Sequence, residues 1–451
     1  MILQWMRQLF NRRPALRTAA GACWSLLPER ITRSNDYFEV LRLNRLSDQG
    51  GANEELLQNI LKAKLVSILQ TALTSVPYYM ESVAVKANEI NQSNVEDALR
   101  TFPYLERSTV MDNRDAFLNR HMSKQFLFSA RSSGSSGQGI VVWRSKADYD
   151  IESAFFDYEW GKIGYDRRTS RVVRIGVDAM RMQSEVPWTY GLRRLMISPY
   201  HLNQAWIEPI YERVVAFAPY VIHSYPSALE ELANFIVDSG RQRIRCVGLL
   251  LSSESLVPHQ IRLFRQSFDA TIVTHYGLCE RTNLAFGRFE NDGEGLSFVF
   301  NPVYSLSENF EHEDGYQEIV GTSYWFSTMP LIRYRTQDFG KIEHGIARSL
   351  LGRKQEFLVT AQGNLLPGIV IYPPEFVWEY IRQYQYFQSQ PGRVILRIVP
   401  KREFGDDVRH RIVEDQQSKW GSLFSFDVQV AGVISLDGTW KSKRIVSTLA
   451  K

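Results

Sequence analysis

The sequence predicts an α/β protein with a large amino-terminal domain and a smaller α+β carboxy-terminal domain. Its 451 residues exceed what one hydrophobic core usually holds, so at least two domains are expected. Short β-branched segments alternate with amphipathic segments across the centre of the chain, which is typical of a parallel or mixed sheet covered by helices. The last ~95 residues mix helical and extended patterns and match the size of a small domain.

The first part of the chain is predicted to be helical, followed by a hairpin. Between residues 53 and 80, apolar residues recur at helical spacing: Leu56, Leu57, Ile60, Leu61, Leu65, Ile68 and Leu69. The extended segments "QFLFSA" and "IVVWRS" then flank the run "SSGSSGQG" at 132–139. A helix with an aromatic face is expected in "ADYDIESAFFDYEWGKIG", which starts at residue 147.

The central segments predict a parallel or mixed sheet. The expected strands are "RVVRIGV", "YVIHSY", "RCVGLLLSS" and "ATIVTHYG", and the helices between them are "PSALEELANFIVDS" and "VPHQIRLFRQSF". Ligands of such sheets bind at the carboxyl ends of the strands, so the loops that follow these strands are the first place to look for a site.

The carboxy-terminal region has its own pattern. Residues 317–360 are rich in strand-forming residues, and we expect a boundary near "GRKQE", which gives domains 1–352 and 353–451. Beyond it we expect a helix in "PPEFVWEYIRQYQ", a strand in "RVILRIVP", another helix and a terminal strand-and-turn region.

Composition narrows the function classes. The net charge of +4 gives no electrostatic case for nucleic acid as the main partner. The cysteines Cys23, Cys246 and Cys279 are far apart, so neither a disulfide framework nor a cysteine zinc site is expected, and a reducing cytoplasm fits best. The sequence contains no run of about 18 apolar residues, so an ordinary transmembrane helix is not expected. Residues 1–14, "MILQWMRQLFNRRP", resemble a basic amphipathic helix, which would either pack on its own domain or contact a membrane surface peripherally.

The run "SSGSSGQG" has two interpretations. Serine and glycine runs are most often linkers or surface turns. Glycines also let backbone N–H groups converge on one point, and serine hydroxyls add small donors, so the run would equally cradle a polyphosphate. The Walker spacing is absent, but both flanks look like strands of one hairpin, which favours the cradle over a linker.

Four segments in order carry a family resemblance: "ARSSGSSGQGIVV", "HYGLCE" at 275–280, "PLIRYRTQD" at 330–338 and "GRKQE" at 352–356. They resemble the phosphate loop, Tyr-Gly-x-x-Glu element, Tyr-Arg-Thr-Gly-Asp element and hinge of the acyl-adenylate-forming enzymes. The segments "PLIRYRT", "HSYPSALEELANF" and "LSSESL" are similar to the sequences of the phenylacetate-CoA ligase branch, and in particular to its members associated with capsule and surface-polysaccharide gene clusters.

This resemblance implies a large multi-sheet amino-terminal domain with a mobile carboxy-terminal lid. It also implies an AMP-forming acid ligase that uses ATP and Mg²⁺ to make an acyl adenylate and then transfers the acyl group to CoA or to an amine, in surface-polysaccharide biosynthesis. The acyl substrate and the acceptor are not readable from the sequence. The alternative is a catalytically degenerate scaffold with this fold that binds partners in polysaccharide assembly.

The resemblance also assigns residues. The phosphates would be wrapped by Ser132, Ser133, Gly134, Ser135, Ser136 and Gly137. Glu280 would be catalytic and bind Mg²⁺, directly or through water, because a hard cation prefers oxygen ligands. Tyr276 would stack on adenine or simply pack in the core, with Ser253 and Glu254 nearby. Asp338 would accept both ribose hydroxyls, Arg353 would hold the nucleotide near the hinge, and Lys441 would contact the acyl carboxylate and α-phosphate, with Lys443 as its competitor.

The sequence departs from the family pattern in the loop and the motifs. Gln138 and Gly139 stand where Lys-Pro or a similar pair is usual, Gln337 replaces the glycine before Asp338, and Gln355 occupies a hinge position where aspartate is common. These changes leave adenylation as the leading expectation, and they motivate the scaffold alternative.

Overall fold

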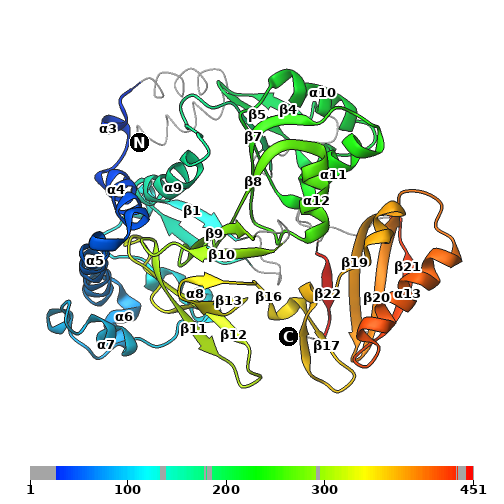
Figure 1. The fold of residues 1–451 in the computed structure, drawn as a ribbon. Coiled ribbons are helices and arrows are strands. Elements are labelled where there is room, and N and C mark those ends of the chain that lie inside the picture. The colour runs from blue at the N-terminus through cyan, green and yellow to red at the C-terminus, as the bar shows by residue number, and fades with distance from the viewer. Residues whose placement is uncertain are drawn as a thin grey trace.

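The fold was analysed in a computed structural model (Figure 1). It describes residues 27–132, 139–176, 179, 185–290, 295–432, 434 and 443–449. The chain begins with helices α3 (Glu29–Thr32), α4 (Asn35–Gln49), α5 (Glu54–Ser75), α6 (Pro77–Ser82), α7 (Val95–Arg100) and α8 (Arg107–Asp112). The helical prediction for 53–80 is confirmed, with a break at Val76, which precedes a proline and is extended.

The Ser/Gly run joins two paired strands, as predicted. Strands β1 (Phe128–Arg131) and β2 (Val141–Arg144) are antiparallel, and Ser129 lies opposite Trp143. Helix α9 (Lys146–Gly161) follows directly. Its Ser145 cap accepts a hydrogen bond from the backbone of Asp148, whose carboxylate accepts one from the backbone of Ser145.

The central sheet is mixed and has the order β14-β15-β10-β9-β8-β7-β6-β3-β5-β4. Its parallel part consists of β5 (Arg194–Ile197), β3 (Val172–Ile175), β6 (Val221–Ser224), β7 (Ile244–Leu251) and β8 (Phe268–Gly277). Antiparallel strands complete it: β4 (Trp188–Tyr190), β9 (Leu284–Phe289), β10 (Leu296–Phe300), β14 (Ile342–Glu343) and β15 (Ile346–Ala347).

Side chains alternate between the two faces of this sheet. Val173, Ile222 and Leu249 share a buried core with helices α10 (Ile207–Phe217), α11 (Pro226–Asp238) and α12 (Pro258–Ser267). On the other face, Val221 and Leu250 pack with Trp160 of α9. This double coverage explains the nearly continuous apolar runs of the central strands.

A smaller antiparallel sheet lies beside the central one, with the order β11-β12-β13-β16 (Figure 1). Its strands are β11 (Ser305–Glu311), β12 (Gln317–Ser323), β13 (Tyr334–Phe339) and β16 (Gly352–Arg353). Leu105, just before α8, bridges to Tyr334 of β13, so the segment that leads into α8 is tied to this sheet. The expected boundary between Gly352 and Arg353 falls inside β16.

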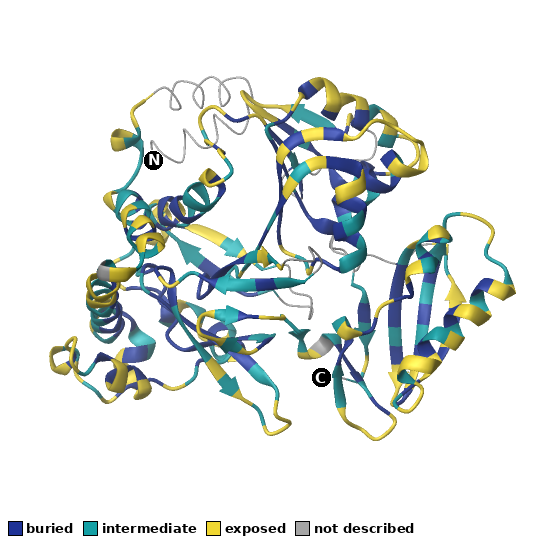
Figure 2. Ribbon diagram, in the orientation of Figure 1, coloured by how far each residue is buried: buried dark blue, intermediate teal, exposed yellow. Residues whose placement is uncertain are grey.

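The carboxy-terminal elements form their own sheet with the order β21-β20-β19-β22, covered by α13 (Asp406–Trp420). Its strands are β19 (Ile381–Gln390), β20 (Arg393–Pro400), β21 (Ser425–Val430) and β22 (Ile445–Ser447), and the hairpin β17 (Phe357–Val359) with β18 (Leu365–Pro367) precedes it. This sheet stands to one side of the rest, and Figure 2 shows its strands largely buried and α13 exposed on its outer side.

The prediction of a helix in "PPEFVWEYIRQYQ" is wrong. Only Glu375–Glu379 is helical, as a 3₁₀ turn, and the chain then enters β19. Tyr384, Tyr386 and Gln388 of β19 are buried at a period of two, and Ile381 and Gln385 are buried as well. The two tyrosines favour the strand, because aromatic residues are common in strands. Among the described residues, no helix combines the length and the apolar character that a membrane crossing needs.

Candidate functional site

Three predicted residues from different strands meet at the carboxyl end of β8. The hydroxyl of Tyr276 donates a hydrogen bond to Oδ2 of Asp338 at 3.0 Å. Nε of Arg353 pairs with the other carboxylate oxygen, also at 3.0 Å, because Arg353 on β16 lies opposite Asp338 on β13. An ionised carboxylate offers about four acceptor sites, so Asp338 keeps capacity on both oxygens for a further pair of hydroxyl donors.

The electrostatics of this trio keep Tyr276 and Arg353 each in one protonation state. Burial, and then the Asp338 carboxylate, raises the pKa of Tyr276 well above its usual value, so the phenol remains a donor. The Asp338 carboxylate also raises the pKa of Arg353, so the guanidinium remains charged. The ring of Tyr276 packs near Phe300, with centroids 5.8 Å apart. This contact fits the packing alternative for Tyr276, and adenine stacking stays a prediction.

Glu280 sits in a second, buried cluster. Its Oε1 accepts hydrogen bonds from Nη1 of Arg107 at 3.0 Å and from the hydroxyl of Tyr334 at 2.9 Å. Side-chain exposure is only 7% for Arg107 and 3% for Glu280, so this is a desolvated ion pair. Sequence reasoning missed both partners. Tyr334 lies in the "YRTQD" segment, but "LERSTV" gives no sign that Arg107 reaches Glu280.

Arg107 also reaches the first residue of the Ser/Gly loop. Its Nη2 donates to Oγ of Ser132 at 3.3 Å, and the same oxygen accepts from the backbone N–H of Ile140 at 3.0 Å. The backbone N–H of Ser132 in turn donates to the Ile140 carbonyl at 2.9 Å. The loop therefore starts beside Glu280. Its other predicted phosphate-binding residues, 133–137, and Gln138 lie outside the described residues.

Gly139 closes the base of this loop, and its geometry explains why no side chain stands there. A Cβ at Gly139 would lie 2.0 Å from the carbonyl oxygen of Ser132. Real contacts never come this close, so any other residue would force the two ends of the loop apart. The departure at position 139 is thus a steric requirement of this hairpin.

Ser253 and Glu254 follow the carboxyl end of β7. Both carboxylate oxygens of Glu254 accept from Ser227, one from its backbone N–H at 2.9 Å and one from its hydroxyl at 2.8 Å. Ser227 is in the first turn of α11, so Glu254 caps that helix and faces its positive end. This is a structural role that the sequence did not reveal, and a nucleotide contact of Ser253 and Glu254 stays a prediction.

Four of these functional side chains are next to a residue with a strained backbone. Ser253, Arg281, Arg333 and Gln337 have φ values of +71°, +57°, +49° and +63°, and they neighbour Glu254, Glu280, Tyr334 and Asp338 respectively. Non-glycine residues in this region cost roughly 1–3 kcal/mol and concentrate at functional sites. The strain therefore marks the same loops that the motifs mark.

The expected catalytic lysine, Lys441, lies outside the described residues. Its competitor, Lys443, precedes β22, and its backbone carbonyl accepts from Nε2 of Gln385 at 2.9 Å. Burial raises the pKa of Glu356, while Arg353 and Lys443 act in the opposite direction. Lys443 is therefore within electrostatic reach of Glu356, whose carboxylate accepts from the backbone N–H of Arg353 at 3.2 Å.

A polar row lines the face of the central sheet that α9 covers. Arg174 of β3 lies opposite His223 of β6, and His275 immediately precedes Tyr276 on β8. Trp160 and Phe156 of α9 contact these histidines edge-on, with centroids 5.3 and 4.7 Å away. Burial lowers the pKa of His275 to about 4 and that of His223 well below its usual value, so both are neutral near pH 7. The sequence did not single out this row.

The residues at the site fit a magnesium ion bound together with a nucleotide. Within the described residues, no three His, Cys, Asp or Glu side chains gather around one point. Mg²⁺ in nucleotide sites typically uses one or two carboxylates and takes its other ligands from phosphates and water. Both contacts of Glu280 given above use Oε1, so its other oxygen suits a metal or a metal-bound water.

Comparisons with known proteins agree with this architecture. No protein-family model matches the chain. Protein CapK of Staphylococcus aureus is 20% identical over 335 residues, which cover 70% of this chain and 73% of CapK. 2-Hydroxyisobutyryl-CoA ligase, solved in its postadenylation state with 2-HIB-AMP, aligns with a TM-score of 0.65 at 12% identity, covering 88% of this chain and 90% of the ligase. The same ligase in its thioesterification state, with 2-HIB-AMP and CoA, gives a TM-score of 0.52 at the same identity and coverage. The chain therefore shares the fold of this CoA ligase.

Proposed function

We propose that this protein activates a carboxylic acid with ATP, through an acyl adenylate, and then transfers the acyl group to CoA or to an amine. The observation that carries the proposal is the pair of clusters at the strand ends. One holds a carboxylate, Asp338, between two donors, and the other places Glu280 and Arg107 at the start of the Ser/Gly loop. The shared fold with a CoA ligase supports the same chemistry.

In this proposal each cluster has one task. Asp338, oriented by Tyr276 and Arg353, accepts the two ribose hydroxyls and fixes the position of the nucleotide. The loop that begins at Ser132 surrounds the β- and γ-phosphates with backbone and hydroxyl donors. Glu280 holds Mg²⁺, which would offset the phosphate charge when bound. Lys441 contacts the carboxylate and the α-phosphate, where charge develops during transfer.

We further place the protein in the phenylacetate-CoA ligase branch and in surface-polysaccharide biosynthesis. The residues of the motifs support the assignment to this branch. The likeness to CapK supports a relationship with that protein. CoA as the acceptor draws support from the ligase solved with CoA, and an amine acceptor is the alternative. The proposed peripheral membrane contact through residues 1–14 rests on their amphipathic pattern alone.

The test is ATP–pyrophosphate exchange across a panel of carboxylic acids. We expect exchange with at least one acid, and we expect Asp338→Asn to raise the KM for ATP by about tenfold or more, because a charged hydrogen-bond acceptor is lost. A matched control is Asp97→Asn, an exposed aspartate of α7 that pairs with Arg100. Absence of ATP binding and of exchange with every acid would favour the scaffold alternative.

A further inference from the structure

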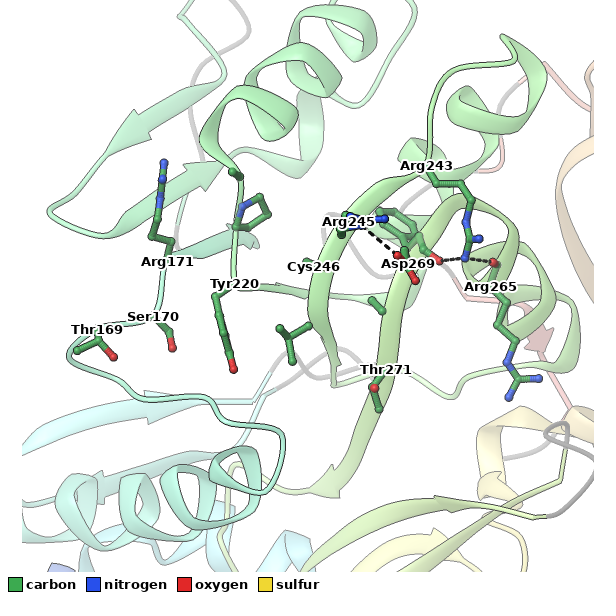
Figure 3. A pocket seen from close by; sticks show the side chains of 15 residues that line it. Thr169, Ser170, Arg171, Tyr220, Arg243, Arg245, Cys246, Arg265, Asp269 and Thr271 are labelled. Atoms are coloured by element: carbon green, nitrogen blue, oxygen red, sulfur yellow. Dashed lines mark hydrogen bonds and ion pairs between the residues drawn. The ribbon is translucent and has the colours of Figure 1, made fainter.

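The structure contains a basic groove that the proposed reaction does not use. A shallow groove of about 820 Å³, largely open to solvent, lies at the amino ends of β3, β6, β7 and β8. Figure 3 shows its side chains, which come from residues 169–171, 218–220, 243, 245–247, 265 and 268–271. Of the candidate nucleotide residues, Glu254 and Tyr276 lie at the carboxyl ends of β7 and β8. An eight-residue strand such as β7 separates the two edges by about 25 Å.

The lining carries an excess of positive charge. Its arginines are Arg171, Arg243, Arg245 and Arg265, and its only acidic side chain is Asp269. All four arginines are exposed, and Arg245 pairs with Asp269 at 3.2 Å in an arrangement that water screens. The lining thus has a formal charge of about +3, which focuses an attractive potential for anions in the hollow.

Arg243 is the best-positioned of the four. Its Nη2 donates to the backbone carbonyls of Phe268 at 2.6 Å and Arg265 at 3.0 Å, which orients the guanidinium (Figure 3). A guanidinium has five N–H donors, so Arg243 retains donors for a ligand after these two contacts. Arg265 lies on α12, so the charges come from separate elements that face one hollow.

We propose that this groove binds a small ligand that carries two or more phosphate groups, at a site separate from the candidate nucleotide site. Guanidinium groups match phosphate oxygens with paired hydrogen bonds, and they are the usual choice for phosphate recognition. A single negative charge would leave most of the lining unneutralised, whereas a diphosphate or a doubly phosphorylated molecule balances it. The volume lies within the range of small-molecule sites. Free phosphates and anionic lipid headgroups share this chemistry.

The test is calorimetric titration with inorganic pyrophosphate, without magnesium, on the full chain. We expect Arg243→Gln to weaken one binding event by about tenfold or more, because a hydrogen bond to a charged group is lost. Ser132→Ala, which removes a hydroxyl from the start of the proposed phosphate loop, should leave that event intact, and this separates it from pyrophosphate binding at the candidate nucleotide site. The matched control is Arg241→Gln, since Arg241 is an exposed arginine of the same segment that pairs with Glu208 and does not line the groove.

A second variant protects the test against a folding defect. Arg171→Gln/Arg245→Gln removes two lining charges that make no backbone contact of the kind Arg243 makes, and it should weaken the same event. Vesicles of phosphatidylcholine with and without phosphatidylglycerol distinguish the source: sedimentation that needs both the anionic lipid and Arg243 assigns the phosphates to lipid headgroups. If both arginine variants bind pyrophosphate and vesicles as the wild type does, the proposal is wrong.

Discussion

At the scale of single residues, the motifs named residues that lie together but did not name their supporting partners. The family resemblance assigns Asp338, Tyr276 and Arg353 individually to the nucleotide, and the structure brings them together from three strands. Their contact with a nucleotide stays a prediction. Arg107 could not be predicted, because it reaches Glu280 across 173 positions of sequence from the first residue of the short helix α8, whose composition is not distinctive. Glu254 was assigned to the nucleotide, yet the structure shows it capping α11, and that contact depends on tertiary placement alone.

Gln337 offers the first prediction, because its backbone adopts a conformation that suits glycine. Its φ is +63°, and its backbone N–H still donates to Oε1 of Glu318 at 2.7 Å. We expect Gln337→Gly to relieve strain and stabilise the protein by about 0.5–1 kcal/mol, after allowing for the greater entropy of glycine in the unfolded chain. The free energy of unfolding in denaturant measures this. The matched control is Gln242→Gly, at an exposed position without positive φ, and this variant should destabilise the protein. If both variants lower the free energy of unfolding equally, the strain argument is wrong.

The buried Arg107–Glu280 pair gives the second prediction. Arg107→Met leaves the Glu280 carboxylate buried without its cation, which should cost about 3–5 kcal/mol. The double variant Arg107→Met/Glu280→Gln should recover a large part of this loss, because the uncompensated charge is removed. Chemical denaturation of the single and double variants provides the measurement. If both single variants and the double variant lose stability additively, the two side chains are not coupled.

At the scale of elements, periodicity predicted the central strands and helices well, and it failed where burial decided the structure. Helices α11 and α12 carry clear amphipathic patterns and end within a few residues of their predicted limits. The segment that becomes β19 contains Arg382, Gln383 and Gln385, which also suit a helix. Its pairing with β20 and β22 decides in favour of the strand, and such long-range contacts are not visible in a local pattern.

Helix α12 gives a prediction about pH. The ring of His259 stacks on Trp378 with centroids 3.6 Å apart, and burial, Lys401, Arg262 and Arg444 lower the pKa of His259 to about 3. The folded state therefore excludes a proton that the unfolded chain binds below about pH 6.5. The contribution of His259 to the free energy of unfolding is fully present above that pH. It decreases as the pH falls toward 3, and about 1 kcal/mol of it is lost at pH 5.5.

His259→Phe tests this argument, because phenylalanine retains the stacking but does not titrate. The loss of unfolding free energy between about pH 7.5 and about pH 5.5 should be smaller in the variant by about 1 kcal/mol. His223 and His275 shift in the same direction and are present in both proteins, so the difference isolates His259. Glu230, whose carboxylate lies 4.0 Å from the ring, is also unchanged. An identical pH dependence in the variant would contradict the assignment.

At the scale of the whole molecule, contacts between the carboxy-terminal sheet and α11 and α12 hold the two parts together. Lys401 donates to Asn234 at 3.0 Å and pairs with Asp238 at 3.6 Å, and Gln383 donates to Glu231 at 3.1 Å. The His259–Trp378 stack lies in the same interface. This interface is mostly polar, which is typical of parts that separate and dock again.

The same docking brings the end of the chain toward the strand ends of the central sheet. Arg444, one residue before β22, donates to the backbone carbonyl of Ser255 at 3.3 Å. In the proposed reaction Lys441 assists adenylate formation, so we expect the interface around Lys401 and Trp378 to serve that step.

Weakening this interface should therefore slow adenylate formation specifically. Trp378→Ala/Lys401→Ala removes the stack and the contacts to α11. Together these contacts should contribute about 1 kcal/mol or more to docking. We therefore expect the rate of pyrophosphate exchange to fall about fivefold or more. Acyl transfer from supplied adenylate to CoA is measured alongside, and an equal fall in both rates would mean that the double variant damages the whole protein rather than this step. Arg402→Ala is the control, since the neighbouring Arg402 is exposed and pairs with Glu379 inside the carboxy-terminal part. Equal exchange rates in the double variant and the control would mean that docking through α11 and α12 has no role in activation.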